Sequence, residues 1–268
     1  MKIQPTKEVL ISKDIEEFGA QGQDGRLAES DHMIIADKDF TIFANKSDIT
    51  KFLAIIGQPI SSISAPSTSL FTSLQTQPSQ SYSSSSFYFH TVFDAPIPLC
   101  QFNFCKDAID MIEQENAGGN SENSEQLSFE IFHRMFGAKL LKTEMQIKYD
   151  TDSWKKTDYL CEIQGHKIGV SVTRTVDRAP PNDFTEEKAT VLLGKKLFGV
   201  CVSNIGVREE DKWERQILHC WSQTPAQAQM MQNAFESFHP RLREKTIIIF
   251  TIAGNHKWIF RQQRRTDP

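Results

Sequence analysis

The residues best suited to chemistry lie in one short segment, "KTDYLCEIQGHKIGVSVTRT", residues 156–175. Runs rich in apolar and β-branched residues on either side of a glycine predict two strands joined by a tight turn. Asp158 opens the first strand, and Ser171 and Thr173 lie on the second. A carboxylate placed there could hold Mg²⁺, whereas neutral hydroxyls are poor replacements for further carboxylates.

Two turns fit this hairpin. With Gln164–Gly165 as the turn, Asp158 lies directly across from Ser171; with Gly165–His166 as the turn, it lies across from Thr173. Directly paired residues share a face of the sheet, and so do residues two apart on one strand. Either turn therefore places Asp158, Ser171 and Thr173 on one face, opposite a mostly apolar face that would pack inward.

The elements that must position this hairpin come mainly from residues 126–268. The patterns predict an amphipathic helix that ends at Gly137, an alternating strand within 138–150, and the two hairpin strands. They then predict a helix over 183–198 that ends at Gly199, a buried strand Val200–Asn204, helices over 209–223 and 226–239, and a closing hairpin around Gly254–Asn255. Three successive strands imply antiparallel pairing, and the helix after them allows a parallel fourth strand through a right-handed crossover.

The front half divides differently. Residues 1–60 predict a small αβ segment, with two strands around Asp37–Lys38–Asp39 and a helix capped at Ser47 or Asp48. Residues 61–86 are Ser-rich and nearly uncharged, which is typical of a linker or loop. Residues 87–125 predict an edge strand, an extended aromatic segment and a polar loop. The predicted class is α/β (α+β), with a mixed central sheet, flanking helices and an irregular N-terminal region.

Composition constrains partners and compartment only coarsely. The chain of 268 residues has a formal net charge of −4, and this charge is divided unevenly. Residues 1–125 carry 8 Lys and Arg against 17 Asp and Glu, whereas residues 126–268 carry 22 against 17. We expect no signal peptide and no transmembrane span. Five cysteines without metal-ligand spacing favour reduced thiols in an intracellular protein, with nucleus and cytoplasm both open.

The predicted order of elements resembles the PD-(D/E)XK nuclease-like superfamily over roughly Leu127 to Asn204. The resemblance implies a restriction-endonuclease-like core with a glutamate on the first helix and an aspartate opening the second strand. These positions fall on Glu130 and Asp158. The third-strand acid and lysine of that family fall on Ser171 and Thr173, so two of its charges are missing.

The resemblance implies Mg²⁺ as the cofactor, if there is one, with Asp158, Glu130 and Glu162 as its ligands. Lys188 or Lys195 on the following helix would stand in for the missing lysine. The implied activity is metal-dependent cleavage of DNA or RNA. The alternative is an inactive nuclease-fold subunit or scaffold whose N-terminal half contacts a protein partner. Taken singly, Asp158 and Glu130 are also explained as turn and surface residues.

Overall fold

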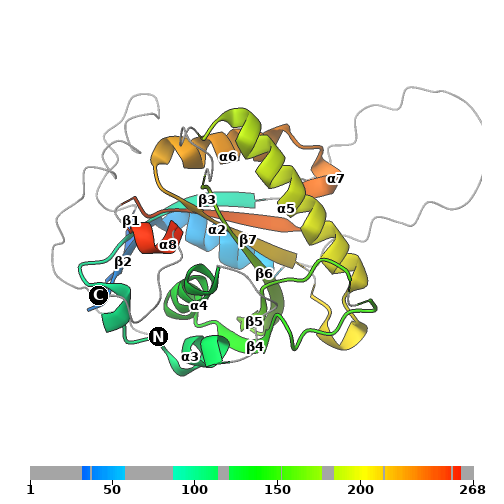
Figure 1. Cartoon of the computed structure of the whole chain (residues 1–268), viewed down its shortest axis with the longest axis horizontal. Coiled ribbons are helices and arrows are strands. Elements are labelled where there is room, and N and C mark those ends of the chain that lie inside the picture. The colour runs from blue at the N-terminus through cyan, green and yellow to red at the C-terminus, as the bar shows by residue number, and fades with distance from the viewer. Residues whose placement is uncertain are drawn as a thin grey trace, which may run out of the picture.

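The computed structural model describes residues 32–36, 38–57, 87–113, 121–151, 153–176, 184–213, 215–254 and 256–260. The predicted Ser-rich linker, residues 61–86, and the basic tail Arg261–Arg265 lie outside these ranges. Across the described residues the fold is α/β, with one mixed sheet and helices on both of its faces (Figure 1). The predicted fold class is confirmed.

Eight strands form the sheet, in the order β1-β2-β3-β8-β7-β6-β5-β4. Their bounds are β1 His32–Ala36, β2 Thr41–Asn45, β3 Phe87–Asp94, β4 Lys139–Thr143, β5 Tyr159–Ile163, β6 His166–Arg174, β7 Arg215–Ser222 and β8 Thr246–Ile252. Strands β4, β5 and β6 pair antiparallel, whereas β6, β7, β8 and β3 pair parallel. The sheet therefore draws strands from three of the segments that the sequence separates.

Helices cover the two faces of the sheet unequally. Their bounds are α2 Lys46–Ile56, α3 Lys106–Glu113, α4 Glu122–Phe136, α5 Glu186–Gly206, α6 Pro225–Ser237, α7 Pro240–Arg243 and α8 Lys257–Phe260. Helices α2, α4 and α8 contribute to the larger apolar core on one face, and α5 and α6 pack on the other face (Figure 1). Any residue on β6 therefore points either toward α4 or toward α5.

The N-terminal strand pair and helix α2 agree with the prediction, apart from the helix cap. The structure places the cap two or three residues earlier than predicted, because the Asn45 side chain accepts a hydrogen bond from the Ser47 amide. Strand β3 differs more, since it lies between β2 and β8 and is not an edge strand. Pro96 and Pro98, which favoured an edge, follow the last strand residue Asp94 and leave its pairing intact.

Helix α5 is the largest departure from the sequence analysis. It continues through Gly199 to Gly206, so the predicted strand Val200–Asn204 is its last part. Among the described helices, α5 alone has the length and apolar composition to cross a membrane, which the sequence analysis did not anticipate. Its inner face packs against the sheet, while Val191, Phe198 and Ile205 are more than 60% exposed. An apolar run of this kind does not separate a buried strand from a buried helix.

Two further elements were assigned to the wrong class. Residues 215–222, predicted as helix, form strand β7, which is buried along its whole length. Because β7 is covered on both faces, it lacks the alternation that marks a half-buried strand. The predicted C-terminal hairpin contains one strand, β8, and its second arm is the short helix α8. The parallel strand after the crossover is thus β7.

Candidate functional site

The β5–β6 hairpin fixes the position of Asp158. Ile163 pairs with His166, so the turn is Gln164–Gly165, with φ values of 51° and 82°. Positive φ at both central residues suits the right-handed twist of a two-residue hairpin. Tyr159 pairs with Val170, and the Asp158 amide donates to the Val170 carbonyl, which places Asp158 opposite Ser171. The first of the two predicted registers is therefore the one observed.

The end of β6 has an open edge at this point. Strand β5 begins at Tyr159, so β6 has no neighbour on that side from Ser171 onward. Two charged side chains hydrogen-bond to the backbone of Val172, which is buried but not paired with β5. Asp158 Oδ2 accepts from the Val172 amide at 2.5 Å, and Lys196 Nζ donates to the Val172 carbonyl at 3.0 Å. A carboxylate and an ammonium group from separate elements thus meet at one residue.

Glu125 adds a second carboxylate from the first turns of α4. Burial and, after it, the negative charge of Asp158 raise the pKa of Glu125 to about 8, while Lys196 opposes the shift. Burial likewise raises the pKa of Asp158, against the effects of Lys196 and of the Val172 amide. Glu144, in the turn after β4, adds negative charge to the same region. Glu125, Asp158 and Lys196 are called the acid–lysine cluster below.

Ser171 and Thr173 share the face of Asp158, as predicted, but Ser171 is already engaged. Gln216 on β7 donates to Ser171 Oγ at 2.8 Å and to Thr157 Oγ1 at 2.9 Å. The side-chain oxygen Oε1 of Gln216 accepts hydrogen bonds from the side chains of Ser203 and Asn204 on α5. Gln216 therefore uses its full hydrogen-bonding capacity in a buried network. These contacts give Ser171 a structural role at the β6–β7–α5 junction.

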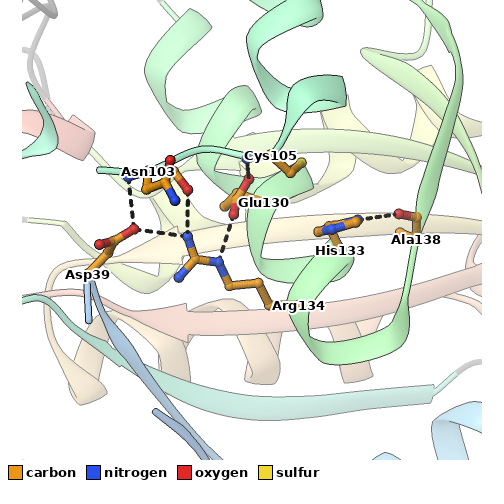
Figure 2. Close-up of polar contacts among 7 residues, drawn as sticks. All are labelled: Asp39, Asn103, Cys105, Glu130, His133, Arg134 and Ala138. Atoms are coloured by element: carbon orange, nitrogen blue, oxygen red, sulfur yellow. Dashed lines mark hydrogen bonds and ion pairs between the residues drawn. The ribbon is translucent and has the colours of Figure 1, made fainter. Parts of the chain in front are cut away.

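Glu130 takes part in a network with Arg134, Asp39 and two backbone segments (Figure 2). Its Oε1 accepts from Arg134 Nε at 2.7 Å, and its Oε2 accepts from the Cys105 amide at 2.9 Å. Arg134 also pairs with Asp39 Oδ2 at 3.1 Å, and the same oxygen accepts from the Asn103 amide. This network, the Arg134 clamp, joins α4 to the β1–β2 turn and to the segment before α3. Glu130 is thus a structural residue, contrary to the site implied by the resemblance.

The remaining predicted site residues lie apart from Asp158. Glu162 is four residues along β5, roughly 13 Å away by strand rise, and forms a half-exposed ion pair with Lys139 at 3.7 Å. Lys188 is exposed in the first turn of α5, about 12 Å along the helix from Lys196. Lys195 is exposed as well. The structure therefore keeps Asp158 near Ser171 and Thr173, and replaces the other predicted charges by Glu125 and Lys196.

The sequence did not single out Glu125 or Lys196, because Glu130 on the same helix and Lys195 next in the chain were chosen in their place. Glu125 precedes the apolar positions that defined the start of the predicted helix, and Glu130 lies within them. Lys196 follows Lys195, and only the helical phase separates the two. Leu193 and Leu197 are buried, which places Lys196 beside the inner face of α5. That phase was available from the sequence, because the helix predicted over 183–198 contains all three residues.

The donor set is small for a metal centre. Within the described ranges, no group of three or more His, Cys, Asp and Glu side chains is placed to hold a metal ion. Mg²⁺ nevertheless often takes only one or two protein carboxylates and completes its shell with water and substrate phosphate. Glu125 and Asp158 supply two carboxylates whose pKa values are raised mainly by burial, and for Glu125 also by the negative charge of Asp158. Lys196 already supplies one positive charge there, so the residues fit weak binding of a cation.

Comparison with known proteins assigns no specific function to this chain. No family model matches the chain. The AAC-rich mRNA clone AAC4 protein of Dictyostelium discoideum is 39% identical over 156 residues, which is 56% of this chain and 23% of that protein. The chain thus spans about a quarter of this relative. There is also a distant structural likeness to Pyrococcus furiosus SfsA in complex with Ca²⁺, at 12% identity over 51% of this chain and 59% of that one, with a TM-score of 0.25. A likeness at that score carries no argument about the site.

Proposed function

We propose that this chain is a nucleic-acid-associated protein with a PD-(D/E)XK nuclease-like core and weak Mg²⁺-dependent phosphodiesterase activity. The single observation that supports this is the convergence of Asp158 and Lys196 on the Val172 peptide groups, at the open edge of β6. The order α4, β4, β5, β6, α5, β7 is the order that the resemblance implies, with β7 as the parallel strand. Glu125 occupies the role expected of the first-helix glutamate.

In this proposal Asp158 and Glu125 would hold the metal ion, which when bound activates water and neutralises phosphate charge. Lys196 lies beside Asp158 and is placed to contact a phosphate oxygen. With two protein carboxylates, affinity for Mg²⁺ alone is low and rises when a substrate phosphate adds ligands. We therefore expect metal binding to depend on the presence of nucleic acid.

The test uses the purified full chain with single- and double-stranded DNA and RNA oligonucleotides, in Mg²⁺ or Mn²⁺. Asp158→Asn preserves size and still accepts the Val172 amide, but it removes the charge. We expect it to abolish cleavage. Asp150→Asn is the matched control, because Asp150 is exposed and only loosely paired with Arg208 at 3.8 Å. Cleavage that survives Asp158→Asn would refute the assignment of the site.

A second candidate is an inactive nuclease-fold subunit or scaffold. It is favoured by the contacts of Ser171, whose hydroxyl is held by Gln216, and by Lys196, which already compensates the carboxylates. This candidate predicts no cleavage by the wild-type chain under any metal condition. It also predicts no calorimetric signal for Mg²⁺ or Mn²⁺, with or without oligonucleotide.

A further inference from the structure

A pocket of about 240 Å³ lies at the beginning of strands β6 and β7, away from the acid–lysine cluster. Its described lining comes from the last residue of α2, from the β5–β6 turn and the start of β6, and from Lys212, Trp213 and Arg215. His166 and Lys167 are the polar residues of the β6 part. None of its described lining residues is acidic. Along β6, its nearest residue Ile168 is roughly 10 Å from Ser171, which faces Asp158.

The two lysines in this pocket have only neutral partners among the described residues. Lys167 Nζ donates to the Glu210 carbonyl at 2.8 Å, and Lys212 Nζ donates to the Asn204 carbonyl at 2.7 Å. Each ammonium group has three donors, so two remain on each lysine.

The neighbouring carboxylates are paired with other lysines. Asp211 binds Lys142 at 2.6 Å, and Glu210 binds Lys148 at 3.1 Å. Because Asp211 and Glu210 form ion pairs with Lys142 and Lys148, they do not neutralise the charges of Lys167 and Lys212 at the rim of the pocket.

Two buried donors form the inner wall. Arg215 and Trp213 are each only 3% exposed, although both line the pocket. The indole Nε1 of Trp213 has no hydrogen-bond partner within the described part of the chain. A buried donor without a partner is costly, which favours a ligand that can accept from it. The ring is fixed in place by close packing on Gly169, where an added Cβ would lie 2.7 Å from it.

We propose that this pocket binds a phosphate group. Two lysines, an arginine and a tryptophan line the pocket, and its described lining holds no acid, so its hydrogen-bond donors and positive charge suit an oxyanion such as phosphate. The phosphate could belong to a free phosphate compound or to the backbone of a nucleic acid, and both share this chemistry. The inference goes beyond the proposed function and does not depend on cleavage at Asp158.

The test has two arms with the full chain at constant ionic strength. Inorganic phosphate is titrated by calorimetry, and a labelled single-stranded oligonucleotide is titrated by fluorescence anisotropy. The double variant Lys167→Gln/Lys212→Gln changes only exposed side chains, so we expect it to fold. It should weaken binding at least about tenfold, because it removes two charge-assisted donors.

The matched control is Lys51→Gln/Lys139→Gln, which changes the net charge by the same amount at exposed lysines elsewhere. It should alter affinity less than about twofold in either arm. Trp213→Phe keeps an aromatic ring on Gly169 but removes the indole donor, and should weaken binding about threefold.

Loss in both arms, or in the oligonucleotide arm alone, supports a site for backbone phosphate. Loss in the inorganic phosphate arm alone supports a site for free phosphate. Equal loss in the control variant, or no binding in either arm, would overturn the proposal. Asp158→Asn should leave phosphate binding unchanged, which separates failure of this inference from failure of the proposed nuclease site.

Discussion

Two of the glutamates on helix α4, Glu125 and Glu130, lie only five residues apart, and their surroundings differ in kind. Glu130 is buried, yet both of its carboxylate oxygens have donors, from Arg134 and from the Cys105 amide (Figure 2). Glu125 lies beside Asp158 with Lys196 as the opposing charge, and its pKa is raised to about 8. One region is an ion-pair network with partners for its charges, and the other is short of positive charge.

This difference separates a structural charge from a candidate functional one. A buried charge that is paired and hydrogen-bonded holds elements together, and its loss is expensive. Carboxylates left with raised pKa values cost stability at neutral pH, and such groups cluster at functional sites. The resemblance implied a site glutamate on α4 and assigned it to Glu130. The structure favours Glu125, because only Glu125 shares its surroundings with Asp158.

The largest expected effect comes from breaking the Arg134 clamp. Arg134→Met keeps part of the apolar stem over Phe40 but leaves the buried Glu130 and Asp39 carboxylates without their cation. We expect a loss of about 3–5 kcal/mol in the free energy of unfolding, measured by urea denaturation. The control Lys139→Met removes an exposed ion pair and should cost less than about 1 kcal/mol. Equal effects of the two substitutions would contradict the assigned role of the clamp.

The next prediction concerns pH. The pKa of Glu125 is about 8 in the folded chain and 4.5 in its ordinary state, so the folded protein binds the extra proton between these values. Stability from this group is therefore complete below pH 4.5 and is lost as pH rises to 8. Asp158, whose pKa is also raised, acts in the same direction.

Glu125→Gln should remove part of this pH dependence. At pH 8 we expect it to increase the free energy of unfolding by about 1–2 kcal/mol, less than the full shift implies because the side chain is partly exposed. Glu130→Gln is the matched substitution on the same helix and should decrease stability by about 2–3 kcal/mol. Urea denaturation at pH 5 and pH 8 measures both. A stability loss with Glu125→Gln at pH 8 would show that the cluster is fully compensated.

Local patterns predicted much of the fold. The hairpin and the shared face of Asp158, Ser171 and Thr173 followed from sequence spacing, although two turns were left open, and so did the end of helix α4 at Gly137. Prediction failed where an element is buried on both sides, as for β7, or where glycine does not stop a helix, as at Gly199 of α5. In both cases the tertiary surroundings outweigh the local signal.

The candidate site was predictable to a smaller extent. Asp158 and its face follow from the hairpin alone, but Glu125 and Lys196 depend on the phases of two helices and on their packing across the sheet. The hydrogen bonds of Ser171 with Gln216 join residues 45 positions apart. No local pattern specifies such a contact, because it requires β6 and β7 to be neighbours.

A third substitution tests the cation of the cluster. Lys196→Met keeps the apolar stem of the side chain but removes the charge beside Asp158 and the donor to the Val172 carbonyl. We expect a loss of about 1–2 kcal/mol at pH 8 and a smaller loss at pH 5, where the carboxylates are more protonated. Lys195→Met is the adjacent exposed control and should have little effect. A loss that is equal at both pH values would show that Lys196 acts only through the backbone.

The smallest expected effect separates Ser171 from the cluster it faces. Ser171→Ala leaves Gln216 with one donor fewer in use, within a network that keeps its contacts to Thr157 and Asn204. We expect a loss of about 1 kcal/mol in the free energy of unfolding, with the same magnitude at pH 5 and pH 8. If Ser171 instead supplied a ligand to the proposed metal site, the substitution would change the Mg²⁺ dependence of oligonucleotide cleavage while leaving stability nearly unchanged. Urea denaturation and a Mg²⁺ titration of the same variant distinguish the two roles, because a structural hydroxyl alters only the first measurement.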